Sequence, residues 1–333
     1  MKRTKPPFRA DHVGSFLRPA ALKDARAKRE KGAITQADLK AIEDREIEKV
    51  VKKQEELGLQ LATDGEFRRS WWHFDFLGML DGVEIFEAEQ GIQFRGVQTK
   101  AQGLRIVGKI AFSNHPMLEH FKFLKAHTKV TPKMTIPAPP VLHFRLPKDG
   151  VNKSVYPDHD QFFQDVGNAY KQAVKAFYDA GCRYLQFNTA LEAKPADMTI
   201  TTHVCRGNFR STWISEGGYE PVAETLLGKV NYDGYFLEYD TERAGGFEPL
   251  RFLPKGNKVV VLGLVTSKSG TLEKKDDLKR RIDEAGKFAP IEQFCLSPQC
   301  GFASTEEGNI LAEEEQWAKL RMIVDVADEI WGR

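Results

Sequence analysis

The chain has 333 residues, with 49 Lys and Arg against 47 Asp and Glu, and a formal net charge of +2 at pH 7. Positive and negative residues are interspersed, so no basic stripe indicates nucleic-acid binding, and no apolar run reaches the roughly 18 residues of a membrane span. Four cysteines are too few for a disulfide framework in a chain of this size. We therefore expect a cytoplasmic protein that can use thiols as ligands.

The first part of the chain alternates short apolar segments with amphipathic helices. Residues 8–14 predict a strand, and a helix is expected over 20–30. Thr35 begins a second helix, because its hydroxyl can cap the helix with Asp38 three residues on, and Gly58 ends it. The next apolar segment predicts another strand at residues 59–63.

Residues 70–128 interrupt this rhythm, and the alternation over 92–112 predicts a hairpin inside an insertion. Further strands are expected near residues 130, 183, 198, 233, 258 and 292, and helices at 159–180, 220–228, 275–287 and 313–331. Eight strands alternating with helices favour a TIM (β/α)8 barrel. A doubly wound sheet is the competing fold, but no G-x-G-x-x-G follows the first strand. Because no linker or repeat is visible, we expect one domain over 1–333.

One connection is shorter than a barrel requires. Only nine residues, including Pro195, separate Asn188 from Met198. A crossover between parallel strands needs about a dozen residues and usually contains a helix. Either the fourth unit has lost its helix or a segment is missing, and the sequence leaves both explanations open.

The strongest chemical signal is His203-Val204-Cys205, where an apolar strand gives way to Arg, Gly and Asn. Side chains at positions i and i+2 of a strand point to the same side, so His203 and Cys205 can converge. Imidazole and thiolate are both suitable zinc ligands. A packed histidine beside a buried cysteine is the alternative, and the motif alone does not decide between them.

Two further candidates follow later strands. Glu238 ends the sixth strand and Cys300 follows the eighth, so both are expected at the same mouth of the barrel as His203 and Cys205. Two thiolates and one carboxylate would make a Zn2+ site net anionic, which favours alkylation of a bound thiolate over activation of water. Glu238 could instead pair with Arg206 or Arg243.

The remaining cysteines and several histidines have simpler interpretations. Cys182 and Cys295 lie in or beside apolar strands and are expected in the core. His115, His120 and His127 have helical spacing and are expected to be solvated.

At the candidate ligands the sequence resembles the cobalamin-independent methionine synthase family, in a short single-barrel form that lacks the amino-terminal half of the full-length enzyme. The zinc pattern of this family is H-x-C, then a glutamate, then a late C-G; here it is met by His203, Cys205, Glu238 and Cys300. The resemblance implies Zn2+ as the cofactor, bound by these residues.

Two other motifs support the resemblance. The early G-S-F is Gly14-Ser15-Phe16, and the G-E after the second strand is Gly65-Glu66. In the family, this serine and glutamate help to bind homocysteine. The acidic pair that holds the substrate amine is replaced here by Gln186-Phe187-Asn188-Thr189, so the resemblance leaves Asn188 as the third candidate substrate-binding residue.

A catalytic proton donor is not assigned. The family places a histidine on the seventh loop, whereas the matching stretch, residues 265–270, has none and offers Lys268 or a nearby acid. The resemblance implies methyl transfer from 5-methyltetrahydrofolate, or from a methylcorrinoid donor, to the zinc-bound thiolate of homocysteine, giving methionine. The alternatives are another zinc-dependent thiol alkyltransferase, such as epoxide:coenzyme M transferase, or a non-catalytic metal-binding relative. The expected partners are small molecules, with no nucleic acid and no membrane.

Overall fold

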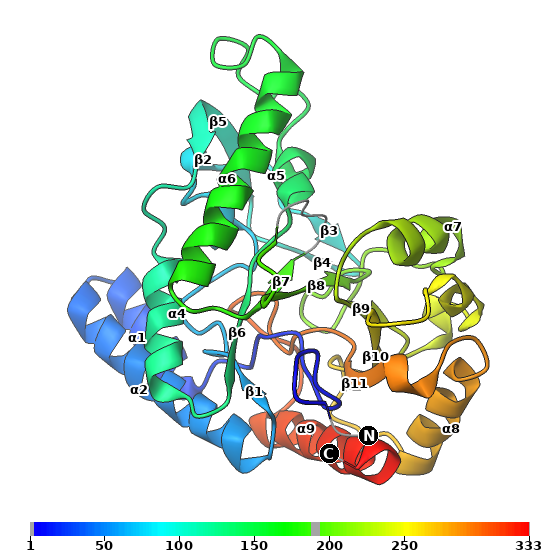
Figure 1. The fold of residues 1–333 in the computed structure, drawn as a ribbon. Helices are drawn as coiled ribbons and strands as arrows, with labels where there is room; N and C mark the ends of the chain where they lie inside the picture. The colour runs from blue at the N-terminus through cyan, green and yellow to red at the C-terminus, as the bar shows by residue number, and fades with distance from the viewer. Residues whose placement is uncertain (1–2, 188–193, 333) are drawn as a thin grey trace.

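The computed structural model describes residues 3–187 and 194–332. Within these residues, a curled sheet of seven strands has the order β1-β6-β7-β8-β9-β10-β11, and every neighbouring pair is parallel (Figure 1). The strands are β1 (Leu61–Ala62), β6 (Thr131–Thr135), β7 (Tyr184–Phe187), β8 (Thr199–Val204), β9 (Gly234–Glu238), β10 (Val259–Val265) and β11 (Phe294–Pro298). The prediction of a TIM-barrel-like α/β fold is confirmed.

The last three strands of the sheet are buried on both faces. All residues of β9, β10 and β11 are buried, and β10 reads Val-Val-Val-Leu-Gly-Leu-Val. A parallel sheet covered by helices on its outside requires such continuous apolar runs. Because the strands are parallel, their carboxyl ends lie at one edge, where the loops that carry the candidate ligands begin.

The segment predicted as the first strand, 8–14, forms only an isolated parallel bridge, between Ala10 and Leu296 of β11. On its other side, the Thr63 hydroxyl donates to the Gly14 carbonyl at 2.6 Å. The Asp11 carboxylate accepts two backbone N–H groups of the segment, at 3.0 and 2.8 Å. Because a side chain takes these donors, the segment lies between β11 and β1 without forming a full ladder.

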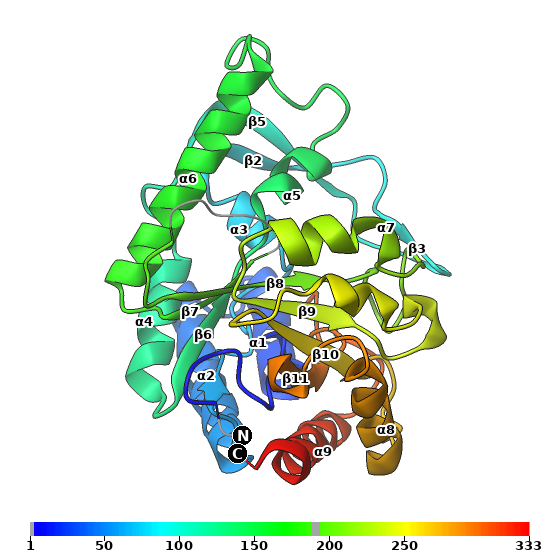
Figure 2. The ribbon, with the colours of Figure 1, turned by 45° about the vertical axis from the view of Figure 1, so that its right-hand side comes forward.

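The predicted helices are present, with one change, and a further long helix forms at Met117–His127, inside the predicted insertion, where no helix was expected. The long ones are α1 (Ala20–Glu30), α2 (Gln36–Glu56), α4 (Met117–His127), α6 (His159–Asp179), α8 (Lys275–Ala285) and α9 (Glu313–Trp331), and they lie around the sheet (Figure 2). Thr35 and Asp38 form the predicted capping box of α2. The helix expected at 220–228 begins as α7 (Glu220–Ala223) and continues as the π-helix η1 (Glu224–Lys229). Shorter elements are α3 (Phe74–Leu77), α5 (Pro139–Arg145), and the 3-10 turns η2 (Glu242–Ala244), η3 (Glu248–Phe252) and η4 (Ile291–Gln293).

The insertion contains a hairpin, but its pairing differs from the prediction. The main pair is β2 (Asp81–Glu87) with β5 (Gln102–Ala111), antiparallel, and a small hairpin joins β3 (Gln93–Phe94) to β4 (Val97–Gln98). The alternation over 92–112 therefore covers one long strand and a minor hairpin, because the partner strand lies earlier in the chain. With α6, the β2–β5 pair forms the upper projection in Figure 1.

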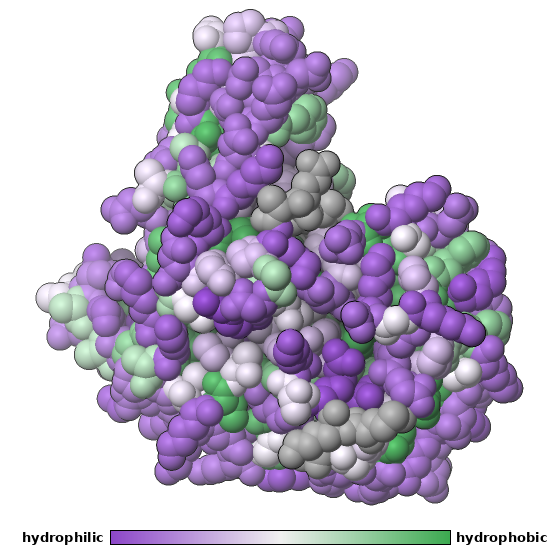
Figure 3. Space-filling view, in the orientation of Figure 1, coloured by the Kyte–Doolittle hydropathy of each residue, from purple (hydrophilic) through white to green (hydrophobic). Residues whose placement is uncertain are grey.

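The surface gives no sign of a membrane-crossing helix. Among the described residues, no helix is both long and apolar enough for a span. The face seen in Figure 3 is mainly hydrophilic, with scattered hydrophobic residues.

Candidate metal centre

Three of the four predicted ligands come together. Nitrogen and sulfur atoms of His203, Cys205 and Cys300 all lie within 4.8 Å of one another, and His203 Nε2 is 3.4 Å from Cys300 Sγ. His203 is on β8, Cys205 follows it directly, and Cys300 follows β11. The i, i+2 spacing thus brings the first two together, and the parallel sheet brings Cys300 to the same edge.

The spacing of these atoms fits a zinc ion. With bonds of roughly 2.0–2.1 Å to nitrogen and 2.3 Å to sulfur, tetrahedral ligands lie about 3.5–3.8 Å apart. The observed group is compatible with that arrangement after small side-chain adjustments. His203 and Cys300 are buried, whereas Cys205 is exposed, so a ligand from solvent could approach from the Cys205 side.

The two thiols are electrostatically unequal. Their mutual hydrogen bond raises the pKa of Cys205 well above its usual value and lowers the pKa of Cys300. Cys300 is therefore the thiol that ionises first. Its sulfur also lies 4.0 Å from the hydroxyl oxygen of Ser304.

The fourth predicted ligand, Glu238, is adjacent but is not part of this three-residue group. Its side chain is completely buried at the end of β9. One carboxylate oxygen accepts from the Gln299 amide at 3.2 Å, and the other accepts from the Arg206 backbone N–H at 3.0 Å. The guanidinium groups of Arg206 and Arg243 lie 3.6 and 3.9 Å from it. Glu238 thus has the ion-pair environment that was the alternative interpretation.

Ser15 lies directly against the Cys300 loop. Its carbonyl accepts from the Phe302 N–H at 2.9 Å. A Cβ atom at Gly301 would collide with Ser15 Oγ. A glycine at this position leaves room for the serine hydroxyl, which would have to move if residue 301 carried a side chain.

Glu66 lies against Gly14 in the same way. A Cβ atom at Gly14 would collide with the Glu66 carboxylate, and Gly14 has a φ of +147°. Glu66 also has a positive φ of 57° in the turn after β1, and its carboxylate is paired with Arg69. Ser15, Glu66 and the Cys300 loop consequently lie next to one another. Asn188, the third predicted substrate-binding residue, lies outside the described residues.

The sequence did not indicate the residues that hold the loops in place. The Asn208 amide donates to the Gly301 carbonyl at 2.7 Å and to Ser304 Oγ at 3.1 Å. The Tyr219 hydroxyl accepts from the Glu238 N–H at 2.8 Å and donates to the Val204 carbonyl at 3.1 Å. These contacts are long-range in sequence, so no local motif could have revealed them.

The predictions for the other cysteines and histidines have mixed outcomes. Cys182 and Cys295 are buried, as predicted. His115 is buried and accepts a hydrogen bond from the Met117 N–H at 3.2 Å, contrary to the prediction that it is solvated. His120 is only partly exposed, and burial lowers its pKa to about 4. The prediction failed for His115 because it lies before α4 rather than in it, and its ring packs against Phe76 and Phe112.

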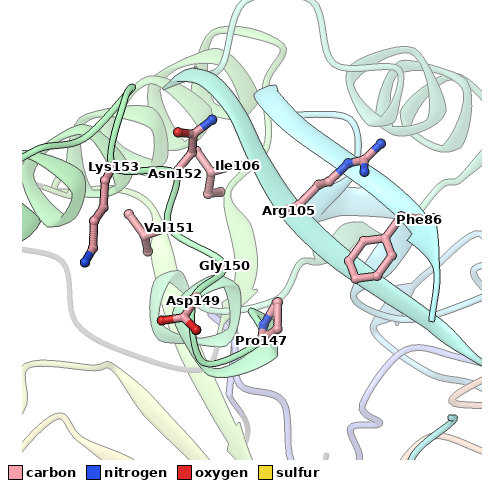
Figure 4. Close-up of a pocket in the computed structure, with 9 residues that line it drawn as sticks. All are labelled: Phe86, Arg105, Ile106, Pro147, Asp149, Gly150, Val151, Asn152 and Lys153. Atoms are coloured by element: carbon pink, nitrogen blue, oxygen red, sulfur yellow. The ribbon is translucent and has the colours of Figure 1, made fainter. Parts of the chain in front are cut away.

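A separate cavity lies away from these residues. A cavity of about 630 Å³ separates the β2–β5 pair from the segment before α6, and it contains none of the predicted site residues (Figure 4). Its lining residues are Phe86, Arg105, Ile106, Pro147, Asp149, Gly150, Val151, Asn152 and Lys153. This cavity is therefore separate from the candidate metal centre.

Comparison with known proteins decides the family. A sequence model described as "Cobalamin-independent synthase, Catalytic domain" matches residues 8–193. The chain belongs to this family. It is 50% identical to the uncharacterized protein YxjH of Bacillus subtilis, an alignment that covers 99% of this chain and 96% of YxjH. That alignment extends over 366 positions, so YxjH contains residues with no counterpart here.

Other members of the cobalamin-independent synthase family extend the comparison. The chain is 24% identical to the 5-methyltetrahydropteroyltriglutamate–homocysteine methyltransferase of Bacillus velezensis, covering 95% of this chain but 42% of that enzyme. A Listeria monocytogenes structure, provisionally named a vitamin-B12-independent methionine synthase, has a TM-score of 0.80 and 42% identity, covering 99% of this chain and 100% of that one. Membership of this family supports methyl transfer to homocysteine.

Proposed function

We propose that this chain is a zinc-dependent methyltransferase that methylates the sulfur of homocysteine to give methionine. The observation that carries the proposal is the group formed by His203, Cys205 and Cys300, with Ser15 and Glu66 next to the Cys300 loop. A two-thiol, one-imidazole donor set suits zinc, and a zinc ion held there would keep a bound substrate thiol deprotonated at neutral pH. Glu238 is the proposed fourth ligand, after release from Gln299.

Other residues of this chain would bind the substrate and hold it in position. The Glu66 carboxylate, oriented by Arg69, is placed to accept hydrogen bonds from the substrate ammonium group. The Ser15 hydroxyl can donate to the substrate carboxylate. Asn208 and Ser304 hold the Cys300 loop at a fixed distance from β8. Such fixed placement favours a direct displacement at the methyl carbon.

The methyl donor belongs to the proposal as well. We propose 5-methyltetrahydrofolate, because the homologous Bacillus velezensis enzyme is named for a methyltetrahydropteroyl substrate. A methylcorrinoid is the second donor, since this chain spans only part of that enzyme. We also propose a cytoplasmic location, because ligands that are free thiols require a reducing compartment.

The test is transfer of a radiolabelled methyl group to homocysteine, with 5-methyltetrahydrofolate and methylcobalamin supplied separately. The proposal predicts labelled methionine in the wild type and at least about a hundredfold less in Cys205→Ser, since ligand and substrate activation are lost together. Cys182→Ser, in which a buried core thiol is replaced, should keep wild-type activity. Absence of labelled methionine with either donor, from a protein that contains zinc, would contradict the proposal.

A further inference from the structure

The two cysteines of the candidate metal centre follow strands that are not neighbours in the sheet. Cys205 follows β8 and Cys300 follows β11, and β9 and β10 lie between these strands in the sheet order. Hydrogen bonds between strands therefore do not directly fix the distance between the two thiols. Contacts between the loops themselves, across the mouth of the barrel, have to fix it.

One such contact is made by a tight turn in the loop after β8. Phe209 and Thr212 exchange backbone hydrogen bonds of 3.2 and 2.9 Å. Both residues between them, Arg210 and Ser211, have a positive φ, of 46° and 64°. Positive φ at both central residues is the pattern of a type I′ turn, in which glycine, asparagine and aspartate are favoured. Arginine and serine adopt it at a cost, and such strained residues persist where the surrounding structure holds them.

The turn is held by two residues of the loop after β11. The Ser211 N–H donates to Asn309 Oδ1 at 3.0 Å, and the Ile310 N–H donates to Ser211 Oγ at 2.8 Å. Ser211 thus donates to one of these residues through its backbone and accepts from the other through its side chain. This reciprocal pair joins the loop that follows His203-Val204-Cys205 to the loop that follows Cys300.

The remaining hydrogen bonds of Asn309 extend the connection to further parts of the site. Asn309 Nδ2 donates to the Ser267 carbonyl, in the loop after β10, at 2.7 Å. The Asn309 backbone N–H donates to the Phe302 carbonyl at 3.0 Å, and Phe302 is two residues after Cys300. Asn309 is buried, so water competes little for these hydrogen bonds. A single residue therefore joins the loops that follow β8, β10 and β11.

We propose that Asn309 is a positioning residue of the metal centre, which holds the Cys205 and Cys300 loops at the separation that zinc requires. This inference rests on the proposed function. Asn309 acts through Ser211 and Phe302 rather than as a ligand. A site whose ligands are already in place loses less conformational freedom when the metal binds, so it binds the metal more tightly. Outer-shell residues of metal sites typically contribute a factor of about 10–100 to the affinity.

The experiment measures the dissociation constant of Zn2+ for the metal-stripped full chain, by competition with a chromophoric chelator. Asn309→Ala should bind Zn2+ about 10–100-fold more weakly than the wild type. Ser211→Ala should weaken binding too, because the Ile310 N–H loses its acceptor. The double variant should lose less than the product of the two single losses, since both side chains hold the same turn. Titration with Co2+, followed by the thiolate-to-cobalt absorption band, should give the same order of affinities.

Gln293→Ala is the matched control, because it removes a buried amide at the opposite end of β11. The Gln293 side chain donates to the carbonyls of Pro254 and Lys258 at 2.9 and 2.8 Å. Its loss should lower the free energy of unfolding, measured by urea denaturation, but leave the Zn2+ dissociation constant unchanged. This control separates an effect on the metal centre from a general loss of stability.

Each other result is decisive. An unchanged Zn2+ dissociation constant in Asn309→Ala overturns the positioning role, while the proposed metal centre stands. Equal weakening in Asn309→Ala and Gln293→Ala overturns it too, because Zn2+ affinity would then follow overall stability. Fully multiplicative losses in the double variant overturn the role assigned to the shared turn. If the folded wild type does not bind Zn2+, the proposed function itself is contradicted.

Discussion

Two buried lysines of the same barrel have opposite environments. Lys133, on β6, is completely buried, and its ammonium lies 3.1 Å from Asp11 and over the ring of Phe236, 4.2 Å from the centroid. Asp11 in turn accepts from the Tyr184 hydroxyl at 2.9 Å. Lys268, at the carboxyl edge of the strands, has a buried ammonium with no hydrogen-bond partner among the described residues. The lysine in the barrel interior is paired with an acid and stabilises the fold. The lysine without such a pair lies at the edge of the sheet where substrates are expected.

The largest expected effect is a difference in the free energy of unfolding when each lysine is replaced by methionine. Lys133→Met should lower the free energy of unfolding by about 3–5 kcal/mol, because it leaves the Asp11 carboxylate buried without its cation. Lys268→Met should change the same quantity by less than about 1 kcal/mol, because no native partner is lost. Urea denaturation of both variants measures the difference. Equal losses would contradict the distinction between the two lysines.

A second prediction concerns packing at the carboxyl edge. Gly301→Ala should cost about 1–3 kcal/mol, because the added methyl group collides with Ser15 Oγ. Ser15→Ala in the same chain should recover part of that loss, giving a favourable coupling energy in a double-mutant cycle. Strictly additive effects would show that the two residues do not touch.

A third and smaller effect is the acid sensitivity that His120 gives to the folded state. Burial lowers the pKa of His120 to about 4, whereas an unfolded histidine titrates near 6.5. The unfolded chain thus binds this proton more readily, so the stability contributed by neutral His120 is present above about pH 6.5 and is lost as the pH falls toward 4. Because His120 is partly exposed, the loss should be about 1–2 kcal/mol.

Urea denaturation at pH 7 and pH 4.5 checks this prediction, with His120→Gln compared with the wild type. The variant should lose less stability on acidification. An identical pH dependence in both proteins would show that His120 titrates normally in the folded state. His127→Gln is a suitable control, since His127 is exposed.

The sequence was informative where the signal is local. Apolar runs and helix caps placed every strand of the parallel sheet and nearly every long helix, because a buried parallel strand must be apolar throughout. The pair formed by His203 and Cys205 was also predictable, since two-residue spacing fixes their common side. To predict that Cys300 lies beside them, both the family resemblance and the parallel topology were needed.

The sequence was uninformative where contacts are distant. The Glu238 carboxylate accepts hydrogen bonds from Gln299 and Arg206, and neither residue is adjacent to it in the chain. The lack of space for a side chain at Gly301 is caused by Ser15, which lies near the other end of the sequence. The burial of the Lys268 ammonium depends on which loops surround it, so the sequence could name the residue as a candidate but could not reveal its environment.

The most direct test of the account is the metal content of the purified protein, measured by mass spectrometry for wild type, Cys300→Ser and Cys182→Ser. The account predicts about one zinc per chain in wild type and in Cys182→Ser, and almost none in Cys300→Ser, with all three proteins folded. A folded wild type without zinc after growth in zinc-containing medium, or a Cys300→Ser variant that keeps its full zinc, would contradict the proposed metal centre.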